Sequence, residues 1–208
     1  MAVGRVALTV RDGARVGDFY ERVLGLEPLA REPGRLSLGA GETTLVELYE
    51  APDARPRPPR ATGLFHLALL VPDRAELAAS LRRIVAQRWP LSGASDHLVS
   101  EALYLADPEG NGIEVYRDRP RAEWRRDGDE VAMATLPLDV DTLFAEGPER
   151  PAARTAPGAR IGHVHLDVAD LATTERFYAG VLGLDVTARG YPGALFLAAG
   201  GYHHHVGA

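Results

Sequence analysis

The chain has 208 residues, of which 46% are hydrophobic and 25% charged, a globular composition that excludes a wholly disordered protein. It contains no cysteine, which excludes disulfides, thiolate metal sites and a cysteine nucleophile. Its formal net charge of -6 argues against nucleic acid as a partner. We see neither a signal peptide nor an apolar run near the roughly 20 residues that cross a bilayer, so we expect a cytoplasmic protein without a membrane partner.

An internal repeat organises the chain. Residues 5–26 align without a gap with residues 163–184, with half of the positions identical, and a weaker copy begins at His66. Each copy opens with the period-two alternation of a strand. A helix should follow near Asp12, Asp73 and Asp170, and short strands separated by glycine-rich turns should follow the helix. The repeated unit is therefore a strand, a helix and about three strands.

We predict an α+β fold of repeated βαβββ modules. Modules at about residues 3–50 and 63–117 should pair into an open barrel, which makes residues 1–117 an N-terminal domain. Residues 118–160 form a linker with a short helix near Asp139 to Phe144, and residues 161–208 form a third module, the first half of an incomplete second barrel. An unpaired third module would expose a sheet edge and apolar surface, which predicts a homo-oligomer.

The first predicted helix carries a stripe of apolar residues on one face. The stripe consists of Val16, Phe19, Tyr20, Val23 and Leu24. It recurs in the third module as Phe177, Tyr178, Val181 and Leu182. We interpret Phe19 and Tyr20 as helix core and not as ligand-stacking residues.

The strand face turned away from the helices carries the residues suited to chemistry. By alternation, these are Arg5, Glu47, His66, Glu114, His163, His165, Tyr202 and His204, whereas His203 and His205 should face away. Imidazoles and a carboxylate that converge from neighbouring strands are typical of a metal site.

Each candidate also has a structural interpretation. His66 could be a hydrogen-bonded core histidine, although Glu114 in the same module could join it in binding a metal. Arg5 could neutralise Glu47 in a salt bridge, which opposes metal binding by Glu47. His97 could cap a turn or shape the pocket.

Several motifs resemble those of the vicinal oxygen chelate superfamily, which includes glyoxalase I, bleomycin-resistance proteins and extradiol dioxygenases. The motifs are FYERVLGL, FYAGVLGL and DPEGNGIEVY. The order of GLFHLALLVPDRAEL, GHVHLDV and GGYHHHVGA is similar to that in bacterial two-domain catechol 2,3-dioxygenases. This resemblance implies a metal, with Fe(II) expected and Mn(II) or another divalent ion as alternatives, held by two histidines and one glutamate. It also implies a small aromatic diol and O2 as substrates.

Carried over residue by residue, the resemblance makes His163 a metal ligand and His204 the catalytic proton shuttle. The two other ligands would lie in a fourth module beyond Ala208, so the resemblance implies a truncated chain and leaves open whether this site is active. His66, Glu114 and Glu47 form a weaker candidate metal site in the N-terminal pair. His165, Tyr202 and His97 are expected to line the substrate pocket.

Two other functions stay open on the sequence alone. The chain could be a metal-free protein that sequesters a small molecule, as bleomycin-resistance proteins do, or a glyoxalase-like isomerase that uses the N-terminal module pair.

Overall fold

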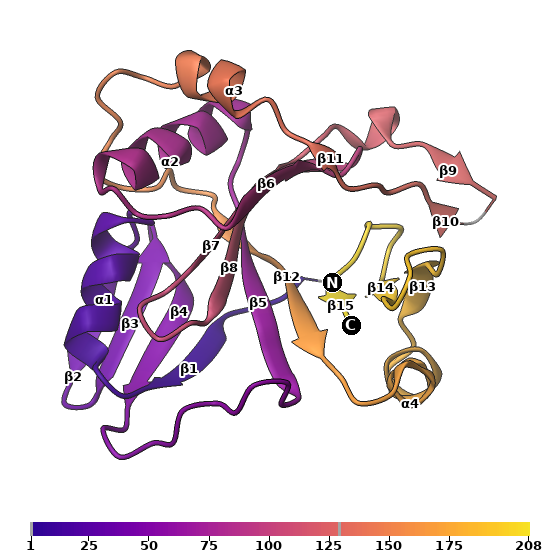
Figure 1. Cartoon of the computed structure of the whole chain (residues 1–208), viewed down its shortest axis with the longest axis horizontal. Coiled ribbons are helices and arrows are strands. Elements are labelled where there is room, and N and C mark those ends of the chain that lie inside the picture. Colours follow the sequence, from indigo (N-terminus) through magenta and orange to yellow (C-terminus); the bar gives the residue numbers. More distant parts are fainter. Residues whose placement is uncertain (1, 129) are drawn as a thin grey trace.

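The computed structural model describes residues 2–128 and 130–208, and it contains the three predicted βαβββ modules (Figure 1). Module one consists of β1 (Val6–Val10), α1 (Gly13–Arg22), β2 (Glu27–Glu32), β3 (Arg35–Ala40) and β4 (Thr43–Glu50). Module two consists of β5 (Gly63–Leu70), α2 (Arg74–Ala86), β6 (Gly93–Asp96), β7 (Ser100–Ala106) and β8 (Gly112–Asp118). Module three consists of β12 (Arg160–Asp167), α4 (Leu171–Glu175), its π-helical continuation η2 (Arg176–Val181), β13 (Asp185–Ala188), β14 (Phe196–Ala198) and β15 (Val206–Gly207).

The described residues of the linker between modules two and three form short elements. These are η1 (Arg121–Glu123), β9 (Arg126–Asp127), β10 (Glu130–Val131), β11 (Leu136–Pro137) and α3 (Val140–Glu146). The helix expected near Asp139 is therefore present as α3, and the Asp139 side chain accepts a hydrogen bond from the backbone of Thr142 at its start.

The strand order is the same in every module: first, fourth, third, second. Module one forms its own four-stranded sheet, β1-β4-β3-β2, whereas modules two and three share a nine-stranded sheet, β11-β6-β7-β8-β5-β12-β15-β14-β13. The two modules join where β5 and β12 pair in antiparallel fashion, which satisfies the backbone groups of both exposed edges. The strand pairing thus crosses the expected boundary between residues 117 and 161, and the third module is not unpaired.

Modules one and two are held together by packing. The apolar stripe of α1 is buried as predicted, in one core that also contains residues of α2, β5 and β8. Phe19 stacks on Trp89 with ring centroids 4.7 Å apart. The linker closes over both helices, since Thr155 donates its hydroxyl to the carbonyl of Leu24 and the buried Arg83 donates to the carbonyl of Ala152.

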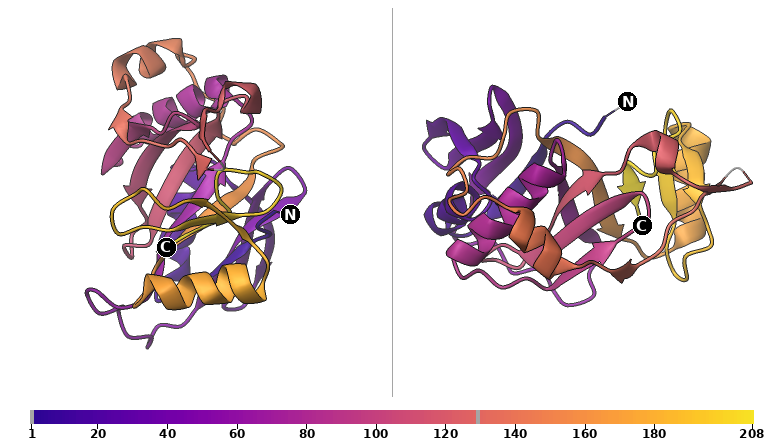
Figure 2. Two further views of the ribbon diagram at one scale, coloured as in Figure 1. Left: turned by 90° about the vertical axis from the view of Figure 1, so that its right-hand side faces the viewer. Right: turned by 90° about the horizontal axis from the view of Figure 1, so that it is seen from above.

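The helix of module three lies apart from this core (Figure 2). Its own cluster is small and includes Leu184, Leu197 and Val206. Phe177 and Val181, the counterparts of the buried Phe19 and Val23, are 49% and 72% exposed. The expected apolar surface on module three is therefore present, and the homo-oligomer stays a prediction.

The nine-stranded sheet has two chemically different faces. On β5 and β8, Leu67, Leu69, Ile113 and Val115 pack into the core shared with module one. His66, Ala68, Glu114 and Tyr116 alternate with them and occupy the other, concave face. The curled sheet therefore presents its polar side chains toward module three.

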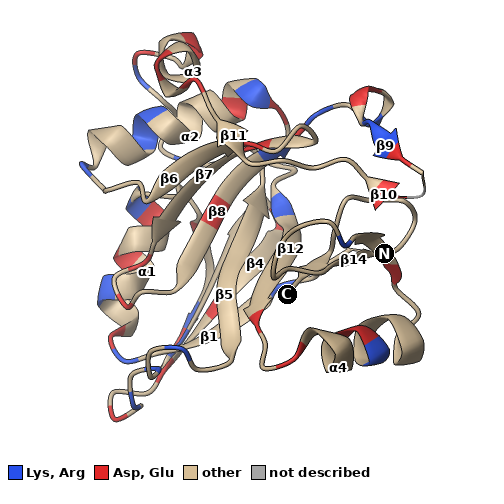
Figure 3. Cartoon of the chain, turned by 45° about the vertical axis from the view of Figure 1, so that its right-hand side comes forward, with Lys and Arg blue, Asp and Glu red and all other residues tan. Residues whose placement is uncertain are grey.

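The charges of the molecule are mixed. Figure 3 shows basic and acidic residues interleaved along the helices and connecting segments in that view. In the described part of the chain, none of the helices combines the length and apolarity needed to cross a membrane.

Candidate functional site

Three strands bring His66, Glu114 and His163 together on the concave face. In the sheet, Ala68 of β5 lies opposite Glu114 of β8 on one side and opposite His163 of β12 on the other. Residues in direct register share a face, so Glu114 and His163 flank the small Ala68 side chain, and His66 joins them two residues along β5. All three polar side chains are buried.

The three side chains converge on one point. Oε2 of Glu114 lies 3.0 Å from Nε2 of His66 and 3.1 Å from Nε2 of His163, and the two Nε2 atoms are 3.4 Å apart. Metal–ligand bonds of about 2.1 Å at right angles would set neighbouring ligand atoms about 3.0 Å apart. Two histidines and one carboxylate with open positions are the donor set of non-haem Fe(II) centres. The residues present therefore fit a divalent ion.

The electrostatics of the group agree with this donor set. Burial would raise the pKa of Glu114, but the charges of and hydrogen bonds from His163 and His66 outweigh burial and hold that pKa well below its usual value. Burial lowers the pKa of His163 to about 4, against the opposing pull of Glu114. Burial also lowers the pKa of His165 to about 3, assisted by His66 and His163. The lowered pKa of Glu114 favours its anion and the lowered pKa of His163 favours its neutral imidazole, the protonation states that bind a metal.

The structure groups these residues differently from the sequence interpretation. His66 and Glu114 were expected in one site and His163 in another whose other ligands lie beyond the chain, but all three form one cluster. The reason is the β5–β12 pairing, which an alignment of repeats does not specify.

Glu47, the third candidate of the N-terminal pair, lies in the separate sheet of module one. There Nε of Arg5 is 2.9 Å from its Oε2, as the salt-bridge interpretation predicted. A hydrogen bond from Arg35 is the main cause that lowers the pKa of Glu47. The structure therefore does not bring Glu47 to the His66–Glu114–His163 cluster.

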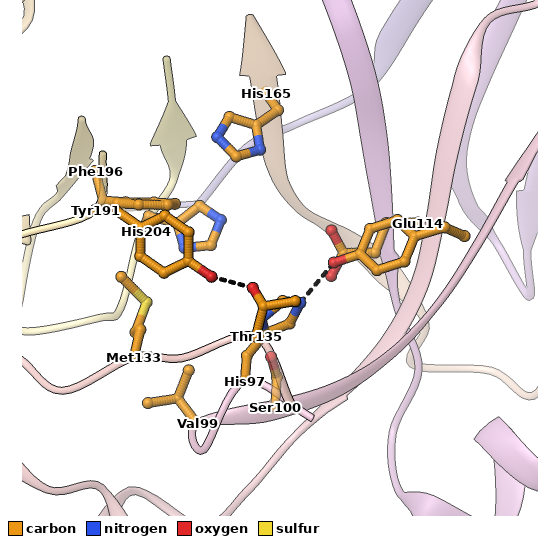
Figure 4. A pocket seen from close by; sticks show the side chains of 11 residues that line it. His97, Val99, Ser100, Glu114, Met133, Thr135, His165, Tyr191, Phe196 and His204 are labelled. Atoms are coloured by element: carbon orange, nitrogen blue, oxygen red, sulfur yellow. Dashed lines mark hydrogen bonds between the residues drawn. The ribbon is translucent and has the colours of Figure 1, made fainter. Parts of the chain in front are cut away.

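A cavity of about 120 Å³ adjoins the cluster (Figure 4). For comparison, an engineered cavity of about 150 Å³ accepts a benzene ring. Its polar lining includes Glu114, His97, His165 and His204, and its apolar lining includes Val99, Met133 and Phe196. His97 and His165 therefore line this cavity, and its role as the substrate pocket stays a prediction. The cavity combines apolar walls with several polar groups.

His97 is fixed in orientation by two partners. Its Nδ1 donates to the carbonyl of Ala134 at 2.7 Å, so its Nε2 accepts the hydroxyl of Tyr104 at 2.7 Å. Burial, followed by the charge of Glu114, raises the pKa of Tyr104. Sequence reasoning missed Tyr104, although it stands on the same face of β7 as Ala102, directly across from Glu114.

His204 packs against His163 with ring centroids 4.0 Å apart. Burial, reinforced by the neighbouring histidines, holds the pKa of His204 well below its usual value. Nδ1 of His204 lies 2.7 Å from Nδ1 of His203, and Nε2 of His203 lies 2.9 Å from Oδ1 of Asp118. His204 thus reaches the cavity expected for it, but it is connected to groups that the sequence analysis did not select.

The expected alternation fails between residues 200 and 205. Gly200 and Gly201 both have positive φ angles, and the strand begins only at Val206. As a result, His203 is fully buried and does not face away. Tyr202 lies behind the cavity wall, where its hydroxyl donates to Oδ2 of Asp118 at 2.9 Å.

Comparisons with known proteins agree with this architecture. The model of the Glyoxalase/Bleomycin resistance protein/Dioxygenase superfamily matches residues 2–115. A protein of Bacillus subtilis (strain 168) named catechol-2,3-dioxygenase is 43% identical over 210 residues, which cover 99% of this chain and 73% of that protein. The chain belongs to this superfamily. The resemblance noted from the sequence motifs is thereby confirmed at the level of the superfamily.

Solved structures support the fold. A putative dioxygenase from Bacillus subtilis subsp. subtilis str. 168 matches 100% of this chain and 63% of its own length, with a TM-score of 0.65 and 16% identity. A glyoxalase/dioxygenase from Nostoc punctiforme matches 57% of this chain and 91% of its own length, with a TM-score of 0.50 and 22% identity. At these identities the likeness concerns the fold alone.

Proposed function

We propose that this protein is an extradiol dioxygenase that opens a catechol-like ring next to its diol, using O2 and a non-haem divalent metal. The observation that carries this proposal is the convergence of His66, Glu114 and His163 beside a partly apolar cavity of about 120 Å³. The 43% identical relative named catechol-2,3-dioxygenase supports the same reaction class.

The metal would be held by the two Nε2 atoms and the Glu114 carboxylate, with Fe(II) proposed ahead of Mn(II). When bound, such an ion supplies the redox chemistry by which O2 reacts with a chelated diol. In this proposal the metal site is complete within modules two and three, because the strand that carries His163 pairs directly with the strand that carries His66.

The chain's own residues would do the remaining work. Val99, Met133 and Phe196 would enclose the ring and exclude water. The Nε2 atom of His204 is buried and has no hydrogen-bond partner among the described residues. It would therefore accept a proton from the diol and later return it, which is the role the resemblance gives to this histidine.

Glu114→Gln tests the proposal, with Glu47→Gln as its matched control. The two glutamates occupy equivalent last strands of modules one and two, but only Glu114 contacts histidines. Protein purified without oxygen and supplied with Fe(II) should hold about one ion per chain and turn catechol yellow. Loss of a residue that only supports a metal ligand typically costs about 10–100-fold in metal affinity or activity. Because Glu114 would bind the metal directly, E114Q should lose at least about 100-fold in metal affinity and in activity, whereas E47Q should retain its metal affinity and its activity.

Two outcomes would contradict the proposal. If E114Q retained metal and ring cleavage, the cluster would not be the metal centre. If wild-type protein took up no metal but bound aromatic compounds tightly, the sequestration function of bleomycin-resistance proteins would replace the enzymatic one.

A further inference from the structure

Two side chains behind the cavity wall, the half-buried Asp118 and the buried His203, are not used by the proposed reaction. Asp118 lies on β8, four residues beyond Glu114 and on the same face. His203 belongs to module three and is fully buried. The contact between them therefore crosses the junction of the two modules that form the candidate site.

We propose that Asp118 and His203 are positioning residues that fix the tautomer of His204 and so present its unprotonated Nε2 to the cavity. This inference rests on the proposed function, because it gives His204 a defined role as a proton acceptor there.

The direction of the hydrogen bonds follows from the donors available. A carboxylate only accepts, so the 2.9 Å contact requires Nε2–H of His203 to donate to Oδ1 of Asp118. In this proposal His203 is the neutral imidazole, whose one N–H is then used on Asp118, so that its Nδ1 is an acceptor. The 2.7 Å contact between the two Nδ1 atoms then requires the proton to lie on Nδ1 of His204. Nε2 of His204 carries the lone pair.

The unpaired Nε2 atom of His204, at one end of this series of hydrogen bonds, is the feature that points to function. Nε2 of His204 is buried without a hydrogen-bond partner among the residues the structure describes, and the ring lines the cavity (Figure 4). An acceptor left unsatisfied in a buried wall costs free energy unless a ligand meets it. A diol hydroxyl in the cavity is a donor of the required kind.

Further contacts hold Asp118 and His203, at the other end of this series of hydrogen bonds. The Tyr202 hydroxyl donates to Asp118, and the Tyr116 hydroxyl lies 2.8 Å from that of Tyr202. Because Tyr202 has a single proton, Tyr116 must be the donor in their contact. The His203 ring also packs against the rings of Tyr202 and Trp124, with centroid separations of 4.1 and 5.3 Å. This packing opposes rotation of the His203 ring, which would reverse the direction of the hydrogen bonds.

The first test is spectroscopic and requires no metal. In metal-free protein labelled with ¹⁵N-histidine, long-range ¹H–¹⁵N correlations distinguish the two tautomers, and His204→Gln identifies the signal of His204. We expect His204 to carry its proton on Nδ1 in the wild type and in His205→Gln. His205 is a control because it lies in the same run of histidines but is not one of the three residues in the Asp118–His203–His204 series of hydrogen bonds. In Asp118→Asn and His203→Phe we expect a mixture or Nε2–H.

The second test is kinetic. In serine proteases, replacing the buried aspartate of the triad by asparagine leaves the geometry intact but lowers kcat about 10⁴-fold through the wrong tautomer. For D118N and H203F we expect kcat to fall at least about tenfold with KM for catechol and iron content unchanged, since a general base contributes about 10²–10⁴-fold. His203→Gln, whose amide can donate to Asp118 and accept from His204, should recover part of the loss.

The proposal is overturned if wild-type His204 is protonated on Nε2, or if its tautomer is the same in the wild type, D118N and H203F. If the protein showed either of these results and were still an active dioxygenase, only the positioning role of Asp118 and His203 would be contradicted. A wild-type protein that shows the expected tautomer but binds no iron and cleaves no catechol would instead overturn the proposed function.

Discussion

At the scale of single residues, Ala68 makes room for the candidate metal centre. It lies in register between Glu114 and His163 and is fully buried. Cross-strand neighbours in a sheet have Cβ atoms about 4.5–5.5 Å apart, so a larger side chain at this position would enter the space where the two ligands meet.

Ala68→Val should therefore weaken metal binding more than it weakens the fold. The added methyl groups would separate the Glu114 and His163 side chains, and we expect metal affinity to fall by about tenfold or more, as for other changes that displace ligands. Overpacking of this kind costs about 1–3 kcal/mol of stability. Calorimetric titration with Fe(II) under anaerobic conditions, together with a urea unfolding curve, measures both effects.

Ala68→Gly is the matched control, because it leaves the space open. It should retain the metal affinity of the wild type and lose about 0.5–1 kcal/mol of stability from the greater freedom of glycine. Equal metal affinity in A68V and the wild type would show that the space above Ala68 does not determine the ligand geometry.

At the scale of elements, the four helices α1 to α4 each begin at an aspartate whose side chain accepts a backbone hydrogen bond. Asp73 does so for α2, accepting from the backbone N–H of Glu76 at 2.9 Å. The Glu76 side chain does not close the other half of a capping box but pairs with the buried Arg83. The start of α2 therefore depends on Asp73 alone for this cap.

Asp73→Ala should lower the free energy of unfolding by about 1 kcal/mol, the usual cost of losing an N-cap side chain. Asp73→Asn should have little effect, since its carbonyl oxygen can accept the same hydrogen bond. Chemical denaturation of the two variants at constant pH measures the difference. Equal stabilities for D73A and D73N would indicate that packing of α2 onto the sheet, not the cap, fixes where the helix begins.

The comparison of sequence and structure also belongs at the scale of elements. Strand alternation predicts the face on which His66, Glu114 and His163 lie, and the repeat predicts the βαβββ module. Neither predicts that β5 and β12 pair, because edge pairing depends on which modules meet in three dimensions. Alternation also misplaces His203. Two glycines with positive φ, Gly200 and Gly201, come before it, and residues 202–205 are not part of the strand that begins at Val206. Asp118 could have been found, because it continues the 114, 116, 118 series along one face of β8.

At the scale of the whole molecule, the repeat places one helix surface in two environments. In module one, Val23 is 4% exposed because the helix packs into the core shared with module two. In module three, the equivalent Val181 is 72% exposed. Both valines stand in the same motif, FYERVLGL in module one and FYAGVLGL in module three, but only the helix of module one packs into the core shared with a neighbouring module.

Substitution of these two valines by aspartate measures that difference. Val23→Asp would place an unpaired carboxylate in the shared core and should cost about 4 kcal/mol or more, or prevent folding. Val181→Asp would stay in contact with water, and because valine and aspartate have similar helix propensities we expect a change within about 0.5 kcal/mol. Urea unfolding followed by circular dichroism gives both values at one protein concentration. A large loss of stability in V181D would mean that another surface covers the helix of module three in solution, and repeating the measurement across protein concentrations would show whether that surface belongs to a second copy of the chain.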